Sequence, residues 1–323
     1  MTRGASFGRA PFVFSNRGLR KNKMIFKETE NDGWRKIRLR AGFVFAILAA
    51  MKLFHANPLR CIRCGACERD CPSRIIHMPE NKTPFVAEAA GPGCLRCQHC
   101  LAVCPASAAT VEGRVSDESL LLTEPGALPT ETQMRLLARG RRTVRQYRAE
   151  DADRALLKRL LDDLAYAPTG RNTRALEIRV IDSAEVMARF REKMLDACRR
   201  NQGAADSLPK RALQAWEAGN DMVLRGAPHA LAMFAPMTAA CPQEDVVIAL
   251  SYFELLAQSA GLGTTWCGLL KWLMETEPEL KRVFGIPETG VYYYTMLFGA
   301  PDVRYARTVQ RAWPEGAVRR VTI

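Results

Sequence analysis

The chain contains the stretch Cys61-Ile-Arg-Cys-Gly-Ala-Cys-Glu-Arg-Asp-Cys-Pro72 and repeats its pattern as Cys94-Leu-Arg-Cys-Gln-His-Cys-Leu-Ala-Val-Cys-Pro105. Each copy has the spacing Cys-x2-Cys-x2-Cys-x3-Cys-Pro, and the two copies are 33 residues apart. Eight of the eleven cysteines belong to this repeat. Three thiols at two-residue gaps can surround one metal centre, whereas the fourth, followed by proline, is placed to reach a second centre.

This spacing predicts two [4Fe–4S] clusters whose ligands are crossed between the copies. Structural zinc sites usually combine paired Cys-x2-Cys units, and disulfides require an oxidising compartment, to which nothing convincing directs the chain. Residues 51–115 therefore resemble a bacterial two-cluster ferredoxin, and we expect a cytoplasmic protein. One cluster is expected to take Cys61, Cys64, Cys67 and Cys104, and the other Cys94, Cys97, Cys100 and Cys71.

The length and composition show that this segment is a minor part of the protein. A chain of 323 residues has room for two or three domains. Its 48% hydrophobic and 25% charged residues exclude wholesale disorder and collagen-like or coiled-coil architectures. Because a ferredoxin-like segment carries single electrons and has no substrate pocket, the residues after it are expected to build the electron acceptor.

The net charge of +13 is concentrated in a basic leader, residues 1–50, which carries eleven Lys and Arg residues and three acidic ones. The leader is either a dispensable extension before a start at Met51, a signal-peptide-like segment, or a tail that touches an acidic partner or a membrane surface. A nucleic-acid footprint should lie on a folded face, so we expect no nucleic-acid partner. The apolar run at 42–51 is too short to cross a bilayer, which needs about 20 residues, so no transmembrane segment is expected.

Residues 130–323 mix helix and strand patterns without regular βαβ alternation, which predicts an α+β fold. Thr130 and Gln133 have the spacing of a helix capping box, and Asp151 or Asp153 can cap the next helix. Residues 116–129, which include Pro125 and Gly126, are interpreted as a linker. Helices are predicted over 130–138, 151–166, 184–200 and 246–260, and strands over 176–181, 227–234 and 291–298.

A basic segment follows the first of these helices. Guanidinium groups form paired, charge-assisted hydrogen bonds with phosphate, and a hydroxyl adds a further donor. The alternative is a solvated basic face, which is the commoner role of an arginine run. The candidate phosphate ligands are Arg141, Arg142, Thr143 and Arg145.

Five motifs in this order resemble the FMN-dependent nitroreductase family, and with the cysteine repeat the chain is similar to its ferredoxin-fused branch. The motifs are Arg141–Tyr147, Ala167–Asn172, Gly226–Pro228, Gly261–Thr264 with Gly268, and Gly299–Pro301 followed by Arg304, Arg307 and Arg311.

The resemblance implies an FMN site with three parts. The basic segment would hold the FMN phosphate, together with Arg307 and Arg311 near the C-terminus. A loop would hold the edge of the isoalloxazine ring, and a glycine turn would let the backbone approach the flavin. The implied loop residues are Pro168, Thr169 and Asn172, and the turn residues are Gly261, Leu262 and Gly263.

The chain departs from the family pattern after the loop, where Asn172-Thr-Arg-Ala-Leu176 replaces the usual Asn-Gln-Pro-Trp. This difference concerns the substrate side of the site. No catalytic side chain is assigned. Three features that resemble reactive groups are interpreted as structural: Cys267 as a small buried residue, His229 as a core or edge histidine, and Tyr292–Tyr294 as strand residues.

The resemblance implies an oxidoreductase that passes electrons from an external donor through two [4Fe–4S] clusters to FMN and on to a small organic acceptor such as a nitroaromatic. The donor would be a ferredoxin, a flavodoxin or a reduced nicotinamide, and the chain would form a homodimer. The alternatives are a non-catalytic electron-transfer or redox-sensing protein, and a family variant that performs ene-reduction or dehalogenation.

Overall fold

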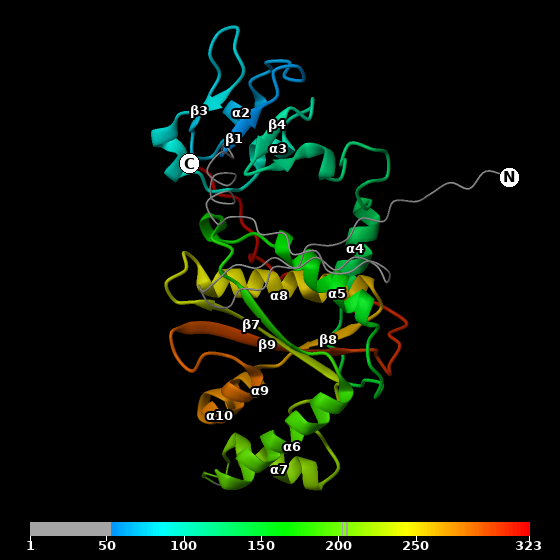
Figure 1. Cartoon of the computed structure of the whole chain (residues 1–323). Coiled ribbons are helices and arrows are strands. Elements are labelled where there is room, and N and C mark those ends of the chain that lie inside the picture. The colour runs from blue at the N-terminus through cyan, green and yellow to red at the C-terminus, as the bar shows by residue number, and fades with distance from the viewer. Residues whose placement is uncertain (1–52, 202, 205) are drawn as a thin grey trace, which may run out of the picture. The chain divides into compact units, whose positions relative to one another are not determined.

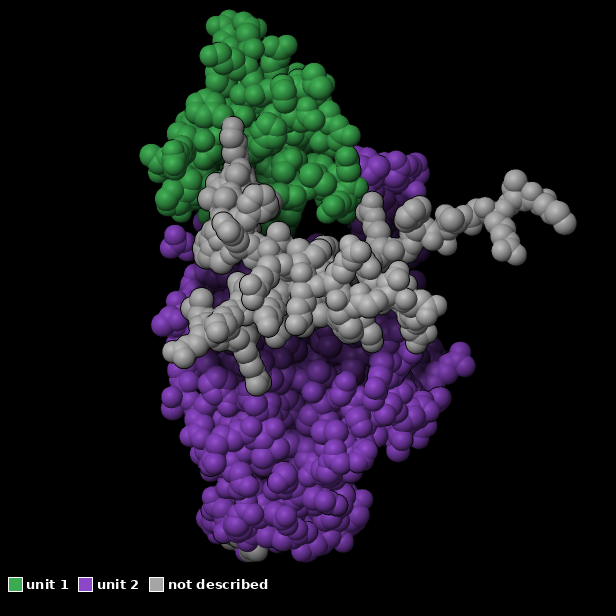
Figure 2. All heavy atoms as spheres, in the orientation of Figure 1, with its two compact units in different colours: residues 1–94, 98–119 green, residues 95–97, 120–323 purple. Residues whose placement is uncertain are grey.

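The computed structural model describes residues 53–201, 203–204 and 206–323, so the predictions for the basic leader lie outside the described residues. The chain divides into two compact units (Figure 2). Unit 1 comprises residues 1–94 and 98–119, and unit 2 comprises residues 95–97 and 120–323. No helix among the described residues combines the length and apolar character needed to cross a membrane.

Unit 1 is built from a three-stranded sheet β1-β4-β5, a strand pair β2-β3 and short helices, in a nearly symmetric order around the cysteine repeat (Figure 1). The strand before the first copy pairs antiparallel with the strand after the second, with Phe54 opposite Val111. The strands between the copies pair with each other, with Ile76 opposite Val86. The elements are β1 (Phe54–Ala56), α2 (Ala66–Arg69), β2 (Ile76–His77), β3 (Phe85–Val86), η1 (Glu88–Gly93), α3 (His99–Ala102), β4 (Ala109–Val111), β5 (Arg114–Val115) and η2 (Ser116–Glu118).

The core of unit 1 is small. A domain of about 60 residues buries too little surface to be more than marginally stable by itself. Bound metal adds its binding free energy to folding, so clusters held by the repeat would stabilise this unit directly. The core consists of Phe54, Ala56, Cys71, Ile76, Leu101, Ala109 and Val111.

Unit 2 contains a four-stranded antiparallel sheet in the order β6-β7-β9-β8, with helices on both faces (Figure 1). This arrangement is the α+β fold predicted from the sequence. The strands are β6 (Glu177–Ile181), β7 (His229–Pro236), β8 (Gly263–Trp266) and β9 (Val291–Gly299). The helices are α4 (Glu131–Gly140), α5 (Arg154–Asp163), η3 (Leu164–Tyr166), η4 (Gly170–Asn172), α6 (Ala184–Arg200), α7 (Leu208–Glu217), α8 (Pro242–Ser259), α9 (Gly268–Thr276) and α10 (Pro278–Phe284).

Strand β7 explains why both faces of the sheet are covered. Its side chains are apolar at almost every position, and successive residues of a strand face opposite sides. Ala232 and Phe234 enter the core under α6, α7, α9 and α10, whereas Leu231 and Met233 enter the core under α5 and α8. The continuous apolar run therefore indicates a central strand buried on both sides.

Local signals predicted several elements of unit 2 correctly. The capping box at Thr130 is present, with the Thr130 side chain accepting from the Gln133 amide and the Gln133 side chain accepting from the Thr130 amide. Helix α6 has the predicted bounds. Asp153 caps α5, whereas Asp151 accepts a hydrogen bond from the Ala184 amide at the start of α6. Helices α7, α9 and α10 and strand β8 were not predicted.

His229 lies in the core, as predicted. Its ring is fully buried and stacks on Phe298 with ring centroids 5.0 Å apart. Its Nε2 accepts a hydrogen bond of 2.8 Å from the amide of Ala152. Burial lowers the pKa of the His229 imidazole, and the negative charge of Asp151 offsets part of this shift. The imidazole is therefore held in its neutral form.

This burial predicts a pH-dependent stability. An unfolded chain protonates histidine below a pH of about 6.5, whereas folded His229 resists protonation, so its contribution to stability is lost as the pH falls below that value. The slope is at most about 1.4 kcal/mol per pH unit. His229→Gln keeps an acceptor for the Ala152 amide but cannot titrate. Relative to wild type, the variant should therefore lose less stability between neutral and acidic pH, and parallel unfolding profiles would contradict this.

Candidate functional site

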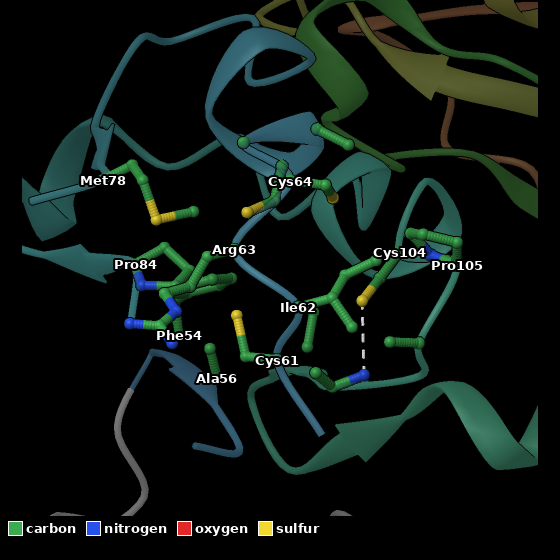
Figure 3. Close-up of a pocket in the computed structure, with 16 residues that line it drawn as sticks. Phe54, Ala56, Cys61, Ile62, Arg63, Cys64, Met78, Pro84, Cys104 and Pro105 are labelled. Carbon is green, nitrogen blue, oxygen red and sulfur yellow. Dashed lines mark hydrogen bonds between the residues drawn. The ribbon is translucent and has the colours of Figure 1, made fainter. Parts of the chain in front are cut away.

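Four cysteines line one hollow in unit 1 (Figure 3). The hollow has a volume of about 350 Å³ including open solvent, and Phe54, Met78 and Pro84 form part of its wall. The four cysteines are those predicted to ligate the first cluster, namely Cys61, Cys64, Cys67 and Cys104. Cys104 comes from the second copy of the repeat, so the fold brings a thiol from one copy to three thiols of the other.

One thiol of this hollow is shifted towards its protonated form. Burial raises the pKa of Cys67, hydrogen bonds from the Glu68 and Cys67 backbone lower it, and the nearby Cys104 and Cys61 add smaller rises. Crowded thiols resist ionising together unless positive charge offsets the repulsion, and thiolates are the form that binds metal. The amide of Ala108 also donates to the Cys104 sulfur at 3.2 Å, the bond drawn dashed in Figure 3. Backbone donors of this kind stabilise cluster sulfurs.

The backbone repeats itself between the two copies. Left-handed residues adjoining right-handed ones turn successive amide groups inward and form anion-binding concavities, which many iron–sulfur sites use. Gly65 needs no strain to adopt this conformation, whereas the other positions carry side chains. The matching left-handed positions are Arg63 and Arg96, Gly65 and Gln98, and Arg74 and Ser107.

The second predicted ligand set is distributed differently. Cys71 is buried in the core of unit 1, and Cys100 packs against that core. Cys94 is half-buried, and Cys97 lies in the stretch grouped with unit 2. Outside the repeat, Cys198, Cys241 and Cys267 are free thiols. No group of three or more His, Cys, Asp or Glu in the described part of the chain is placed to hold a single metal ion.

The basic segment lies along strand β8 in unit 2. Thr143 forms a parallel bridge with Thr264, and the Val144 amide donates to the Thr264 carbonyl at 2.9 Å. The Thr265 hydroxyl donates to the Val144 carbonyl. The sheet therefore brings the predicted phosphate segment to the predicted glycine turn, although more than a hundred residues separate them in sequence.

Arg141 has a partner that sequence reasoning missed. Its guanidinium lies 3.1 Å from the carboxylate of Glu254 on α8, and the two side chains are only 26% and 10% exposed. Glu254 is the only charged residue in the apolar run 246–260, and a lone acid in such a helix signals a buried partner. Glu254 therefore neutralises part of the positive charge of Arg141 within the protein.

The two glycines of the turn serve different physical purposes. Gly261 has a φ of +81°, and a Cβ there would meet nothing within 4 Å, so its backbone conformation requires glycine just after α8. Gly263 has no such φ, but a Cβ there would lie 2.5 Å from Cγ2 of Val144. Gly263 thus permits the close approach of the basic segment to β8, a packing reason beyond the flavin contact that the resemblance implies.

Gly263→Ala is expected to destabilise unit 2 by about 1–3 kcal/mol, the usual cost of overpacking, because Val144 must move. Gly140→Ala is the matched control, since its Cβ would come no closer than 4.0 Å, to the Gln258 side chain. Denaturant unfolding measures both. Combining Gly263→Ala with Val144→Gly removes the clashing side chain. The double variant should therefore lose less free energy of unfolding than the two single variants lose in sum. A Gly263→Ala variant within about 0.5 kcal/mol of wild type would contradict this packing.

The loop implied for the ring edge packs on the opposite end of α8. The Gly170 amide donates to the Asp245 carboxylate at 2.8 Å. A Cβ on Gly170 would lie 2.7 Å from the Cys241 sulfur, which fixes the loop against the helix start. Arg171 and Asn172 both have a φ of 53°, an uncommon conformation for residues other than glycine. Such strain is typical of functional loops.

The loop and the basic segment pack against different parts of α8. Asp245 and Glu254 are nine residues apart on α8, about 14 Å along the helix axis. The loop contacts Asp245 through Gly170, and the basic segment contacts Glu254 through Arg141.

The C-terminal arginines are exposed, in a segment without helix or strand. The Tyr305 hydroxyl donates to the Thr143 carbonyl at 3.4 Å, so this segment crosses the basic segment two residues before Arg307. Within the described residues, Arg142, Arg145, Arg307 and Arg311 form no ion pair with a carboxylate. Unlike Arg141, these guanidiniums are uncompensated, which fits the phosphate of a bound cofactor.

A sequence model of the nitroreductase family matches residues 138–300, just over half of the chain. The chain belongs to the nitroreductase family. A 4Fe-4S dicluster domain matches residues 60–109, ahead of the family region. The protein is thus an oxidoreductase of this family with an N-terminal iron–sulfur domain, as the motif order suggested. No curated protein sequence matches the chain.

Solved structures of nitroreductases are similar to part of this chain. A nitroreductase with bound FMN from Bacteroides fragilis has a TM-score of 0.49 and 18% identity, and covers 60% of this chain and 100% of its own. A nitroreductase with bound FMN from Desulfitobacterium hafniense has a TM-score of 0.47 and 21% identity, with 60% and 100% covered. NfnB from Mycobacterium smegmatis, in complex with NADPH, has a TM-score of 0.45 and 18% identity, with 59% and 99% covered.

Proposed function

We propose that the protein is a cytoplasmic iron–sulfur flavoprotein that passes electrons from an external donor through two [4Fe–4S] clusters to FMN and on to a small organic acceptor such as a nitroaromatic. The observation that carries this proposal is the hollow shared by Cys61, Cys64, Cys67 and Cys104, in a chain whose second unit belongs to the nitroreductase family. A domain that carries single electrons can supply them to an oxidoreductase domain in the same chain.

The residues of unit 2 fit FMN through their charge and backbone. When bound, FMN accepts electrons one at a time and can deliver two together as a hydride. Arg142, Thr143 and Arg145 would hold its phosphate on β8, with Arg307 and Arg311 closing over it. Gly261 and Leu262 would adjoin the ring, and Pro168, Thr169 and Asn172 would hold its edge.

A homodimer would complete this site. The outer face of α8 carries apolar side chains that the protomer leaves partly uncovered, with Val247 40% and Tyr252 42% exposed. Ile248, Tyr252 and Leu255 are spaced to form one stripe along the helix. If two copies pack α8 against α8 about a two-fold axis, the first turns of each helix lie beside the last turns of the other. The loop of one protomer would then meet the basic segment of its partner.

Anaerobic reconstitution followed by flavin absorbance, iron quantification and sedimentation tests the proposal. We expect one FMN and about eight irons per chain, in a dimer. Absence of flavin, or far fewer irons, would refute it. A screen of small acceptors, following the reoxidation of the reduced holoenzyme, then identifies the substrate class. Clusters that reduce and reoxidise without turnover of any acceptor would support the non-catalytic electron-transfer alternative.

A further inference from the structure

An exposed leucine, Leu59, lies two residues before Cys61, which lines the cysteine hollow. Leu59 is 95% exposed, and a hydrogen-bonded turn holds it there. The Asn57 side chain accepts from the Leu59 amide at 2.9 Å, and the Asn57 carbonyl accepts from the amides of Arg60 and Cys61. A side-chain cap of this kind makes a stable turn. The exposure of Leu59 is therefore built into the fold.

A second large exposed apolar side chain, Ile62, follows three residues later and lines the hollow itself. Ile62 is 65% exposed and follows Cys61 in the sequence, and Cys64, which lines the same hollow, is itself exposed (Figure 3). Single exposed aliphatic residues are common, but here one lines the cysteine hollow and the other lies two residues before Cys61. Apolar contact with these two residues would bring another redox centre close to the cluster.

Arg63 is the one charged side chain among the described residues that line the hollow. No acidic side chain occurs between residues 53 and 67. Arg60 is neutralised by Asp117 at 2.8 Å, and Arg69 donates to the Cys64 carbonyl at 2.9 Å. Arg63 is exposed, has a φ of 58° and forms no ion pair among the described residues. A strained, uncompensated arginine at this position suits a negatively charged partner.

We infer that Leu59, Ile62 and Arg63 form the docking surface for an acidic one-electron-carrying protein that supplies electrons to the first cluster. This inference rests on the proposed function and selects a protein donor over a reduced nicotinamide. In each encounter the donor is oxidised by one electron and the cluster is reduced by one, and no bond forms or breaks. Arg63 steers the donor by charge, while Leu59 and Ile62 supply the dry contact.

Binding provides the first test, independent of turnover. A purified acidic two-cluster ferredoxin is titrated onto the holoenzyme by calorimetry at low and high ionic strength. Arg63→Glu is expected to weaken the affinity about tenfold at low salt and much less at high salt, because salt screens the charge. Leu59→Glu should weaken it similarly. Lys82→Glu is the matched control, since it reverses an exposed charge in the same unit but does not line the hollow, and it should change the affinity less than about twofold.

Electron delivery provides the second test and separates this inference from the proposed function. For each variant, turnover driven by reduced ferredoxin is divided by turnover driven by dithionite, which needs no docking surface. We expect this ratio to fall about tenfold in Arg63→Glu and Leu59→Glu, but not in Lys82→Glu. An unchanged ratio and affinity, or NADH reducing the clusters faster than ferredoxin does, would overturn the docking surface alone. Failure of dithionite to reduce clusters and flavin would instead count against the proposed function.

Discussion

Cys104→Ala is expected to lower the iron content from about eight to about four per chain and to reduce ferredoxin-driven turnover to background. The physical reason is that Cys104 lines the hollow of Cys61, Cys64 and Cys67, so its loss removes the first cluster and the electron entry point. Cys198→Ala is the control, because that thiol is buried in α6 and should leave all the iron in place. Iron and sulfide analysis of anaerobically purified protein measures the change.

Double variants distinguish crossed ligation from ligation within each copy. If the ligands are crossed, Cys61→Ala with Cys104→Ala still removes only one cluster and retains about four irons. Cys94→Ala with Cys104→Ala then removes both clusters and leaves almost no iron. Ligation within each copy reverses the two results, so the pair of measurements decides between the arrangements even if each single variant loses the same amount.

Arg145→Ala is expected to weaken FMN binding about ten- to hundredfold, the equivalent of roughly 1.5–3 kcal/mol for a hydrogen bond to a charged group. Arg145 is exposed beside β8 and has no carboxylate partner in the described chain, so its charge is available to the phosphate. Arg139→Ala on α4 removes another exposed arginine and should leave the affinity unchanged. Fluorescence titration of apoprotein measures both.

Riboflavin supplies the discriminating ligand, because it has the same ring as FMN but no phosphate. Arg145→Ala should leave the affinity for riboflavin at the wild-type value. Equal losses for FMN and riboflavin would show that the variant disturbs the ring site or the fold, and would remove Arg145 from the phosphate site.

Features that depend on neighbours in sequence were predictable. The Thr130–Gln133 capping box and the bounds of α6 follow from residues within a few positions of each other. The cysteine spacing predicted which thiols belong together, and the hollow gathers the first predicted set. The apolar run at 227–234 likewise predicted a strand, which the structure has as β7.

Other features depend on pairings over long distances and were not predictable. Strand β8 is only four residues long and begins with glycine, so its strand conformation comes from pairing with β9 and with the basic segment. The linker predicted over 116–129 begins with η2, whose Ser116 donates to carbonyls of the preceding fold. No pattern among the residues near Ser116 in the sequence indicates this contact.

The sequence by itself determined the chemistry of this protein: eight thiols at cluster spacing, a basic segment and the order of the family's motifs. Spacing within a few residues limits which side chains can face one metal centre or one phosphate. This limit depends on the local backbone and not on the fold. Only the tertiary structure decided how those groups are used. It paired Arg141 with Glu254, placed Val144 where Gly263 must lack a side chain, and separated the ring loop from the basic segment along α8. These outcomes depend on which distant strands and helices pack together, and that packing is set by the whole core.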